Sequence, residues 1–405
     1  MINQSSERIT ERNLIKPEVD RAYLINTLKA LLDIPSPSGY TDSISRFVCE
    51  ELVRLGMSPE LTRRGAIRVT LKGKRSQPNR ALVGHLDTIG AMVRTLKSDG
   101  RLAIGPIGTW SSRFAEGARV TIFTDRGHQR GTIVPLCSSG HAYGDAVDEL
   151  PVTWDHIEVR VDGRSRTGDE LYFAGFRVGD FVAIDPSPEF LDNGFIVSRH
   201  LDDKAGVACM LTAAKIVRDA GLNLSIDCHL LLTIFEEVGS GASGVLHRDI
   251  AEMVSVDNAV LAPNQNSSEH GVTVAMMDSF APFDYHLTHR LIDIASRYNL
   301  RYRRDVFRYY RSDAASAVSA GNDIRTALVC FGVDASHGYE RTHIDSLVTV
   351  IQLLVLYMQS DPAVERDKDE LADLSGFPEQ HVVQPPIPEK RAPDTVGMQD
   401  DGQDP

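Results

Sequence analysis

Short apolar runs alternate with longer segments of helical periodicity along most of the chain, and this alternation predicts an α/β fold. The apolar runs predict strands at 66–71, 81–83, 195–198, 229–235, 254–256 and 327–333. Apolar residues spaced three and four positions apart predict helices at 18–34, 42–55, 204–218, 287–298 and 347–358. We therefore expect a mixed sheet with helices on both faces.

The pattern changes between about residues 92 and 193, where short apolar runs are separated by Gly, Asp, Pro and Ser turns. This spacing predicts a small β-barrel or sandwich. We expect one α/β domain built from 17–91 and 194–365, with the β-rich domain 92–193 inserted in it. A flexible polar arm is expected at 1–16. A largely disordered tail is expected at 366–405, because the end of the chain is rich in Pro, Asp and Gln.

The composition narrows the class of protein. The chain has 405 residues, of which 42% are hydrophobic and 24% are charged, as in soluble globular proteins. The net charge of −13 argues against nucleic acid or an anionic membrane as a main partner. The five cysteines form no CxxC pair, which predicts reduced thiols in a cytoplasmic protein. No apolar run approaches the length of a signal core or a membrane span.

Glu236 and Glu237 stand side by side at the end of the apolar run 229–235. Adjacent carboxylates at the carboxyl end of a buried strand are unfavourable, because like charges repel and burial disfavours the ionised form. A positively charged group must therefore neutralise the two carboxylates. A pair of metal ions is the interpretation that this position favours.

Histidines and aspartates follow the ends of the other predicted strands, and in open α/β sheets ligands collect at that edge. Imidazole and carboxylate ligands without paired cysteines suit zinc, cobalt or manganese and argue against a structural thiolate site. The candidates are His85, Asp87, Asp202, Asp203, Asp257, His337 and His343.

The local position of these residues suggests their roles. Alternate residues of a strand share a face, so Asp87 can orient the ring of His85 from behind. Asp202 and Asp203 taken alone would cap the helix that begins near Lys204. Together with the other clusters, Asp202 is interpreted as a carboxylate that bridges two metal ions, while Asp203 keeps the capping role.

The segment 239–244 offers a competing interpretation, because it matches GxGxxG after a strand and Asp257 follows it. The chain would then be a nucleotide-binding oxidoreductase with a pyrophosphate at a helix N-terminus. Against this, Glu236 and Glu237 would repel a pyrophosphate, and the motif lies deep in the chain. The glycines are better explained by backbone that passes close to a crowded metal site.

His337 and His343 compete for the last ligand position. His337 lies in a flexible turn at 335–338, and His343 lies just before the helix led by Asp345. We expect one of the two histidines to be a ligand and the other to contact substrate.

In combination these residues resemble the M42 family of cocatalytic metallo-aminopeptidases, which are glutamyl aminopeptidase-like. The similarity runs in family order from about residue 18 to residue 360, with an inserted β domain where the family has one. No single motif is specific, but the combined set is. The matching stretches are 32–39, 85–87, 201–206, 236–239, 256–257, 312–314 and 341–343.

The resemblance implies a phosphorylase/hydrolase-like α/β/α metallopeptidase domain with an inserted β-barrel. It implies two divalent ions per chain, zinc or cobalt with manganese as a further option. The implied ligands are His85 and Asp257 on one ion, Glu237 and His343 on the other, and Asp202 between them. The family usually has Arg-Tyr-Ile-His-Ser-Pro where segment 341–346 reads Arg-Thr-His-Ile-Asp-Ser, so His337 stays open as the alternative to His343.

The implied activity is that of an aminopeptidase on small peptides, EC 3.4.11-like, in which Glu236 takes a proton from water and gives it to the leaving amine. A metallo-deacylase or a carboxypeptidase-like amidohydrolase is the alternative. The resemblance also implies a homo-oligomer, with a hollow dodecamer as one form. The stretches 305–313 and 338–343 further resemble a bacterial subgroup associated with operons for the osmoprotectant N-acetylglutaminylglutamine amide, which implies that capped dipeptide, or a fragment of it, as substrate.

Overall fold

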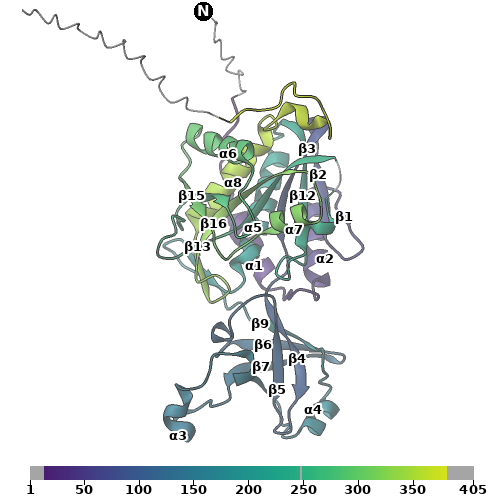
Figure 1. The fold of residues 1–405 in the computed structure, drawn as a ribbon. Helices are drawn as coiled ribbons and strands as arrows, with labels where there is room; N and C mark the ends of the chain where they lie inside the picture. The colour runs from purple at the N-terminus through teal and green to yellow at the C-terminus, as the bar shows by residue number, and fades with distance from the viewer. Residues whose placement is uncertain (1–12, 247–248, 381–405) are drawn as a thin grey trace, which may run out of the picture.

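The computed structural model describes residues 13–246 and 249–380. They form an α/β domain and a closed β-barrel, and Figure 1 shows the barrel standing off one end of the α/β domain. The chain leaves the α/β domain after β3 (Gly73–His85), forms the barrel, and rejoins the large sheet at β10 (Glu189–Phe190). The predicted fold class, a mixed α/β sheet with an inserted small barrel, is confirmed.

The described part of the α/β domain holds an 11-stranded mixed sheet. Besides β3 and β10 its strands are β1 (Glu60–Leu61), β2 (Ile67–Leu71), β11 (Phe195–Ser198), β12 (Leu224–Thr233), β13 (Ile250–Leu261), β14 (Val272–Met277), β15 (Tyr302–Val306), β16 (Arg325–Asp334) and β17 (Glu340–His343). Four central strands run parallel in the order β12, β3, β13 and β16. Every residue of β12 is buried, so both faces of the sheet are covered at this strand.

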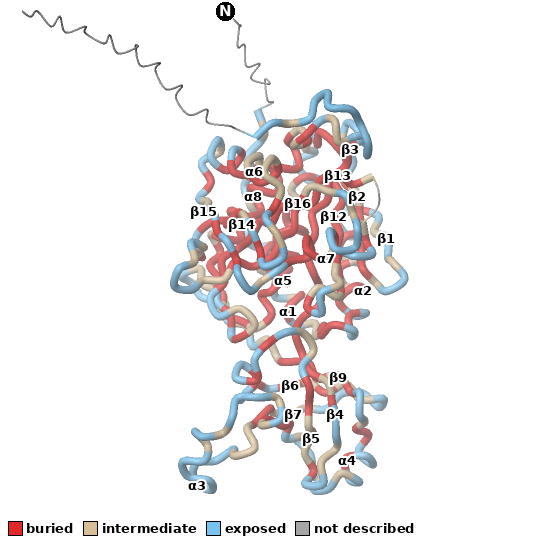
Figure 2. Tube along the Cα trace, viewed as in Figure 1, coloured by how far each residue is buried: buried red, intermediate tan, exposed pale blue. Residues whose placement is uncertain are grey.

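The predicted long helices are all present. They are α1 (Arg21–Leu32), α2 (Asp42–Arg54), α5 (Leu201–Asp219), α6 (Tyr285–Arg297) and α8 (Ile344–Gln359). A shorter helix, α7 (Asp313–Ser319), is also present in this domain. α5 packs against α1 and α8, and it buries Val207, Met210 and Leu211 on the face that its periodicity predicts. Figure 2 shows the buried residues concentrated in the strands and in the helices packed on them.

The inserted domain is a barrel with its own hydrophobic core. Its strands are β4 (Gly90–Leu96), β5 (Leu102–Ile107), β6 (Arg119–Thr124), β7 (Gly127–Pro135), β8 (Ile157–Val161) and β9 (Phe181–Ile184). β9 pairs with both β4 and β6, which closes the sheet and decides between the barrel and the sandwich. Ile104, Val120 and Val159 fill the interior, separate from the core of the α/β domain.

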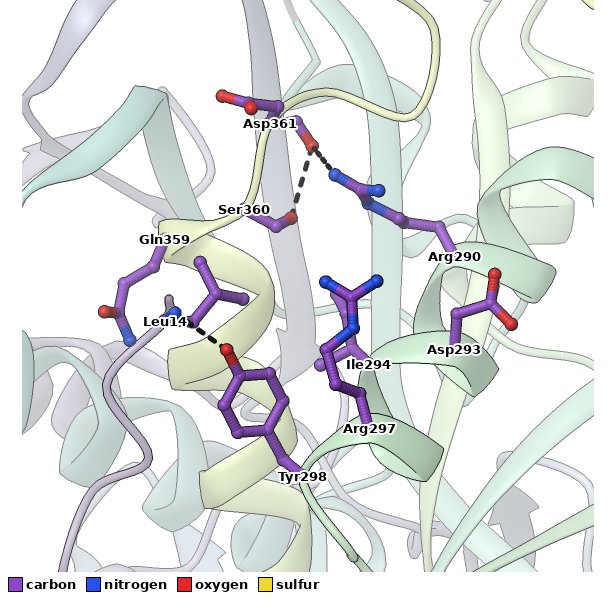
Figure 3. Close-up of a pocket in the computed structure, with 9 residues that line it drawn as sticks. All are labelled: Leu14, Arg290, Asp293, Ile294, Arg297, Tyr298, Gln359, Ser360 and Asp361. Atoms are coloured by element: carbon purple, nitrogen blue, oxygen red, sulfur yellow. Dashed lines mark hydrogen bonds between the residues drawn. The ribbon is translucent and has the colours of Figure 1, made fainter. Parts of the chain in front are cut away.

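Part of the expected arm and part of the expected tail are attached to the α/β domain. The backbone N–H of Leu14 donates to the hydroxyl of Tyr298 at 2.7 Å, as Figure 3 shows. Asp367 accepts a hydrogen bond from Arg325 at 2.5 Å. Residues 1–12 and 381–405 of these two segments lie outside the described residues. Within the described chain, no helix is long and apolar enough to cross a lipid bilayer.

Candidate metal centre and active site

The parallel strands bring the predicted acids and one predicted histidine to a single edge of the sheet. β3 ends at His85, β12 leads into Glu236 and Glu237, and β13 carries Asp257. Within the described residues, two groups of three side chains at this edge have ligand atoms within 4.8 Å of one another. The first group is His85, Asp202 and Asp257, and the second is Asp202, Glu237 and His337.

Asp202 belongs to both groups and lies between their histidines. Its Oδ1 atom is 3.1 Å from Nε2 of His85, and its Oδ2 atom is 3.3 Å from Nε2 of His337. Asp202 is 5% exposed and sits at the start of α5, where its own backbone is not yet helical. One carboxylate oxygen therefore faces each group, which is what a carboxylate bridging two cations requires.

Both imidazoles are oriented by main-chain carbonyl groups. Nδ1 of His85 lies 2.9 Å from the carbonyl oxygen of Asp87, and Nδ1 of His337 lies 3.0 Å from that of Thr109. A proton on Nδ1 that is donated to a carbonyl leaves Nε2 as the nitrogen that faces Asp202. Thr109 lies between β5 and β6, so the barrel orients one of the two rings.

Asp87 lies behind His85, as predicted, but it acts through a different atom. Its carbonyl contacts the ring, while its carboxylate Oδ1 is 3.7 Å from Nδ1. The carboxylate instead accepts the backbone N–H groups of Glu236 at 3.2 Å and Glu237 at 3.3 Å, and the hydroxyl of Ser38. Asp87 therefore fixes the backbone that carries the two adjacent glutamates.

Asp203 does not cap α5, which corrects the predicted role. The helix is preceded by His200 as its N-cap residue, and the Asp203 carboxylate accepts the backbone N–H of His85 at 3.1 Å. Gly206 makes room for this side chain, because a Cβ atom there would lie 2.0 Å from Asp203 Oδ1. Asp203 thus links the start of α5 to the end of β3.

The structure brings His337 to Asp202 and places His343 outside this group. β17 runs antiparallel to β11, with Glu340 paired to Ser198 and His343 paired to Phe195. His343 therefore lies three residues, roughly 10 Å, beyond Glu340 along the strand.

The surroundings of His343 explain what it does instead. Its Nε2 lies 3.0 Å from the carbonyl oxygen of Asn193, and its Nδ1 accepts the N–H of Asp345 at 3.1 Å. His270 and Asp345 form a third histidine and carboxylate group with it. The ring of His343 therefore caps α8, and both of its nitrogens have backbone partners.

Glu340 is a functional candidate that the sequence did not reveal. It is 1% exposed, and its carboxylate accepts the N–H of Asp202 at 3.2 Å and the N–H of His337 at 3.0 Å. Burial and the charge of Asp202 raise its pKa to about 8. Glu340 therefore ties together the backbone of two residues of the second group. A single glutamate in a short strand carries no sequence signal for such a role.

The buried acids and His337 in the cluster shift one another's pKa values. Burial raises the pKa of Glu236 and of Asp257 well above the usual range, and neighbouring carboxylates add to the shift. Burial alone would lower the pKa of His337, but Glu237 and Asp202 outweigh it and raise that pKa to about 12. Glu236 and Asp257 would therefore be stabilised in their charged forms by additional positive charge, which a divalent cation would supply.

The cluster opens into a large cavity between the two domains. The cavity has a volume of about 1390 Å³ and is lined by Asp202, Glu236, Glu237, Asp257 and His337, by the barrel segment 108–111 with Phe114, and by residues 304–311. The cavity in Figure 3, between α6 and the end of α8, has only about 20 Å³, enough for roughly one water molecule. The large cavity can hold a short peptide beside the cluster.

The GxGxxG segment does not open a helix. Its last four residues form only the short 3₁₀ turn η4 (Gly241–Gly244), so no helix N-terminus is available for a pyrophosphate. A Cβ atom on Gly241 would lie 1.8 Å from Asp313 Oδ1. The glycine therefore allows Asp313 to approach the backbone.

Comparison with known proteins decides the family. Residues 65–353 match the family model described as M42 glutamyl aminopeptidase. The chain belongs to the M42 peptidase family. It is 35% identical over 334 residues to the Bacillus subtilis protein named "Putative aminopeptidase YhfE", covering 82% of this chain and 96% of that protein. This M42 member is accordingly an enzyme that hydrolyses peptides, of the aminopeptidase type.

Solved structures agree on the fold of this M42 enzyme. A TET aminopeptidase from a marine sediment Thaumarchaeota archaeon superimposes with a TM-score of 0.76 at 17% identity, covering 83% of this chain and 96% of that one. The TET1 peptidase of Pyrococcus horikoshii gives a TM-score of 0.73 at 20% identity, covering 83% and 99%. The α/β domain with its inserted barrel is therefore the architecture of TET aminopeptidases.

Proposed function

We propose that this M42 enzyme is a dinuclear metal-dependent aminopeptidase that acts on small peptides. The observation that carries the proposal is the position of Asp202, which presents one oxygen to each of two groups of buried ligand atoms. The donor set consists of imidazoles and carboxylates, which suits zinc or cobalt, with manganese as a further option.

The geometry supports a specific ligand assignment. His85 and Asp257 would hold one ion, Glu237 and His337 would hold the other, and Asp202 would contact both. When bound, two such ions polarise the scissile carbonyl group and lower the pKa of a water molecule. The carbonyl contacts of His85 and His337 leave the Nε2 atoms facing Asp202, where they would hold the ions.

Glu236 is the proposed proton carrier. Its Oε2 atom lies 3.9 Å from Nε2 of His85, and its side chain faces the large cavity. Burial and nearby carboxylates raise its pKa, which suits a group that accepts a proton from water and returns it to the leaving amine. Asp87 holds the backbone N–H of Glu236 and so positions this glutamate.

The proposal extends to assembly, location and substrate. The related Pyrococcus horikoshii TET1 peptidase is described as assembling into a tetrahedron or a large octahedral shell, and we infer a homo-oligomer in the cytoplasm for this chain too. A dodecamer would have about twelve times the chain mass of 44.6 kDa in a sedimentation experiment. From the resemblance to the osmoprotectant subgroup, we propose N-acetylglutaminylglutamine amide, or its deacetylated form, as substrate. An aminopeptidase should cleave only the form with a free amine.

Metal content tests the central proposal. Protein purified without chelator should contain close to two zinc, cobalt or manganese ions per chain, and the Asp202→Ala variant should lose most of both. Asp345→Ala, which removes a carboxylate outside the two groups, should keep them. Should Asp202→Ala fail to fold, Asp202→Asn gives the same comparison with less change in shape. Absence of metal from the wild type, with no hydrolysis after any of the three metals is added, would falsify the proposal.

A further inference from the structure

One buried polar atom beside the candidate metal centre has no partner within the fold. The hydroxyl oxygen of Tyr310 is shielded from solvent, and among the described residues it makes no hydrogen bond. Buried hydroxyl groups in proteins are nearly always hydrogen-bonded, because the loss of water without a new partner is unfavourable. The stability of the fold therefore does not account for this hydroxyl group.

The ring of Tyr310 is held by apolar packing. Tyr310 lies between β15 and α7, and its ring meets that of Phe307 edge to face, with the centroids 5.3 Å apart. Phe307 is 1% exposed, and its N–H donates to the carbonyl of Met277 at 3.0 Å. The carbonyl of Tyr310 accepts the N–H of Ser279 at 2.9 Å. The ring and the backbone are thus fixed without any contribution from the hydroxyl group.

The Tyr310 hydroxyl belongs to the surroundings of the first ligand group. Tyr310 lines the large cavity together with Asp202 and Asp257. Burial raises the pKa of Tyr310 well above its usual range, and the negative charges of Asp257 and Asp202 raise it further. Burial also raises the pKa of Asp257, and the nearby Tyr310 hydroxyl opposes that shift. The hydroxyl group therefore lies beside the carboxylate of Asp257.

The carboxylate of Asp257 has room for one more donor. A carboxylate offers about four lone-pair positions. The Oδ1 atom of Asp257 accepts the main-chain N–H of Asn258 at 2.6 Å and the side-chain amide of the same residue at 3.2 Å. Both donors come from the next residue of β13, so they hold the carboxylate from one side. With an ion on a third position, one position remains for the hydroxyl of Tyr310.

We propose that Tyr310 is a positioning residue of the first ion site, whose hydroxyl donates to the carboxylate of Asp257 and holds it in the orientation that binds the ion. The inference rests on the proposed dinuclear function and gives a role to a residue outside the ligand set. A donor to a metal-binding carboxylate fixes its orientation, and the loss of such a partner weakens metal binding by about ten- to a hundredfold.

Two tyrosines on one loop give a matched pair of variants. Tyr310→Phe removes the hydroxyl and keeps the ring that packs on Phe307. Tyr309→Phe is the control, because Tyr309 lines the same cavity but is 96% exposed. Competition between the metal-free full-length protein and a chelator for added zinc measures the affinity for each ion. Tyr310→Phe should weaken the binding of one of the two ions by about tenfold, and Tyr309→Phe should weaken neither.

Thermal unfolding separates positioning from a structural role. Because the hydroxyl of Tyr310 has no partner in the fold, metal-free Tyr310→Phe should melt at the wild-type temperature or slightly above it. Zinc raises the melting temperature more when it binds more tightly, so the increase on adding zinc should be smaller in this variant. A lower melting temperature of the metal-free variant, with an unchanged zinc affinity, overturns the inference in favour of a structural role.

A spectroscopic signal reports on the hydroxyl group itself. Near-ultraviolet difference absorbance during the zinc titration should show a tyrosine signal in the wild type and in Tyr309→Phe, and this signal should be lost in Tyr310→Phe. Unchanged zinc affinity and an unchanged signal in Tyr310→Phe overturn the inference alone and leave the proposed function in place. A wild type that binds no zinc contradicts the proposed function, and the inference with it.

Discussion

The Nδ1 atom of His337 lies 3.0 Å from the main-chain carbonyl oxygen of Thr109, so the inserted barrel orients a side chain of the candidate metal-binding cluster. The neighbouring Trp110 anchors this loop, because its Nε1–H donates to the carbonyl of Gly90 at 3.0 Å and its ring packs against Trp154. The barrel therefore contributes to the candidate active site.

Trp110→Ala should weaken the second metal group without unfolding the α/β domain. Loss of the Gly90 contact frees the Thr109 loop, and the ring of His337 loses its fixed orientation. We expect metal affinity or kcat/KM to fall by about ten- to a hundredfold, the usual effect of removing an outer partner of a ligand. Metal competition with a chelator measures the first quantity. Phe173→Ala, an exposed aromatic of the barrel, is the control, and an equal effect of that variant contradicts the prediction.

His337→Ala and His343→Ala should differ in metal content. His337 faces Asp202 and Glu237 at 3.3 Å each, so its loss should leave about one ion per chain in place of two. His343→Ala should keep both ions and lose stability instead, since it removes the cap of α8 and the contact with Phe195. Elemental analysis and thermal unfolding of both variants measure the difference. The reverse pattern would restore His343 as the ligand.

Glu236→Gln should abolish turnover and keep the metals. The amide retains the shape of the side chain but cannot accept and return a proton, so kcat should fall by at least about a hundredfold. Metal content should equal that of the wild type, because Glu236 belongs to neither group of three ligands. Glu116→Gln, at an exposed barrel residue, controls for the loss of charge. Substantial activity in Glu236→Gln would remove this residue from the proposed mechanism.

Glu340→Gln should impair the second metal group through its positioning of Asp202 and His337. A glutamine offers one acceptor oxygen where the glutamate uses two, so one of the two backbone N–H groups loses its partner. We expect chelators to strip one ion from the variant about tenfold more readily than from the wild type. Glu269→Gln removes an ion pair with Arg341 nearby and serves as the control. A shift in melting temperature without a change in metal affinity would indicate a purely structural role.

His229 should make the fold sensitive to mild acid. Burial, with a further contribution from Arg68, lowers its pKa to about 4. As the pH falls below about 6.5, the unfolded chain binds a proton that the folded chain binds only near pH 4, so the free energy of unfolding decreases across this window. After allowance for partial solvent screening the loss is on the order of 1–2 kcal/mol.

Urea unfolding at pH 7 and pH 4.5 measures this effect. His229→Gln, which cannot titrate, should lose less stability than the wild type between the two pH values. Identical losses in the two proteins would show that other groups set the acid sensitivity.

Several parts of the cluster could be predicted from local sequence because strand ends are a local property. An apolar run followed by a polar residue shows where a buried strand stops, and His85, Glu236 and Glu237 all stand at such stops. Parallel strands bring their carboxyl ends to one edge of the sheet, so these residues meet whatever the details of packing. The same reasoning explains why the long helices appear where the apolar periodicity places them.

Only the tertiary structure shows that His337 lies beside Asp202 while His343 does not, and only it shows the contacts of Glu340 and Thr109. Each depends on contacts between elements that are distant in the sequence. β17 pairs antiparallel with β11, and a loop of the barrel contacts His337 at the sheet edge. A sequence determines which residues end a strand, because that follows from neighbours along the chain. It does not display which loop a residue meets more than two hundred positions away, because that contact is set by the packing of the whole domain.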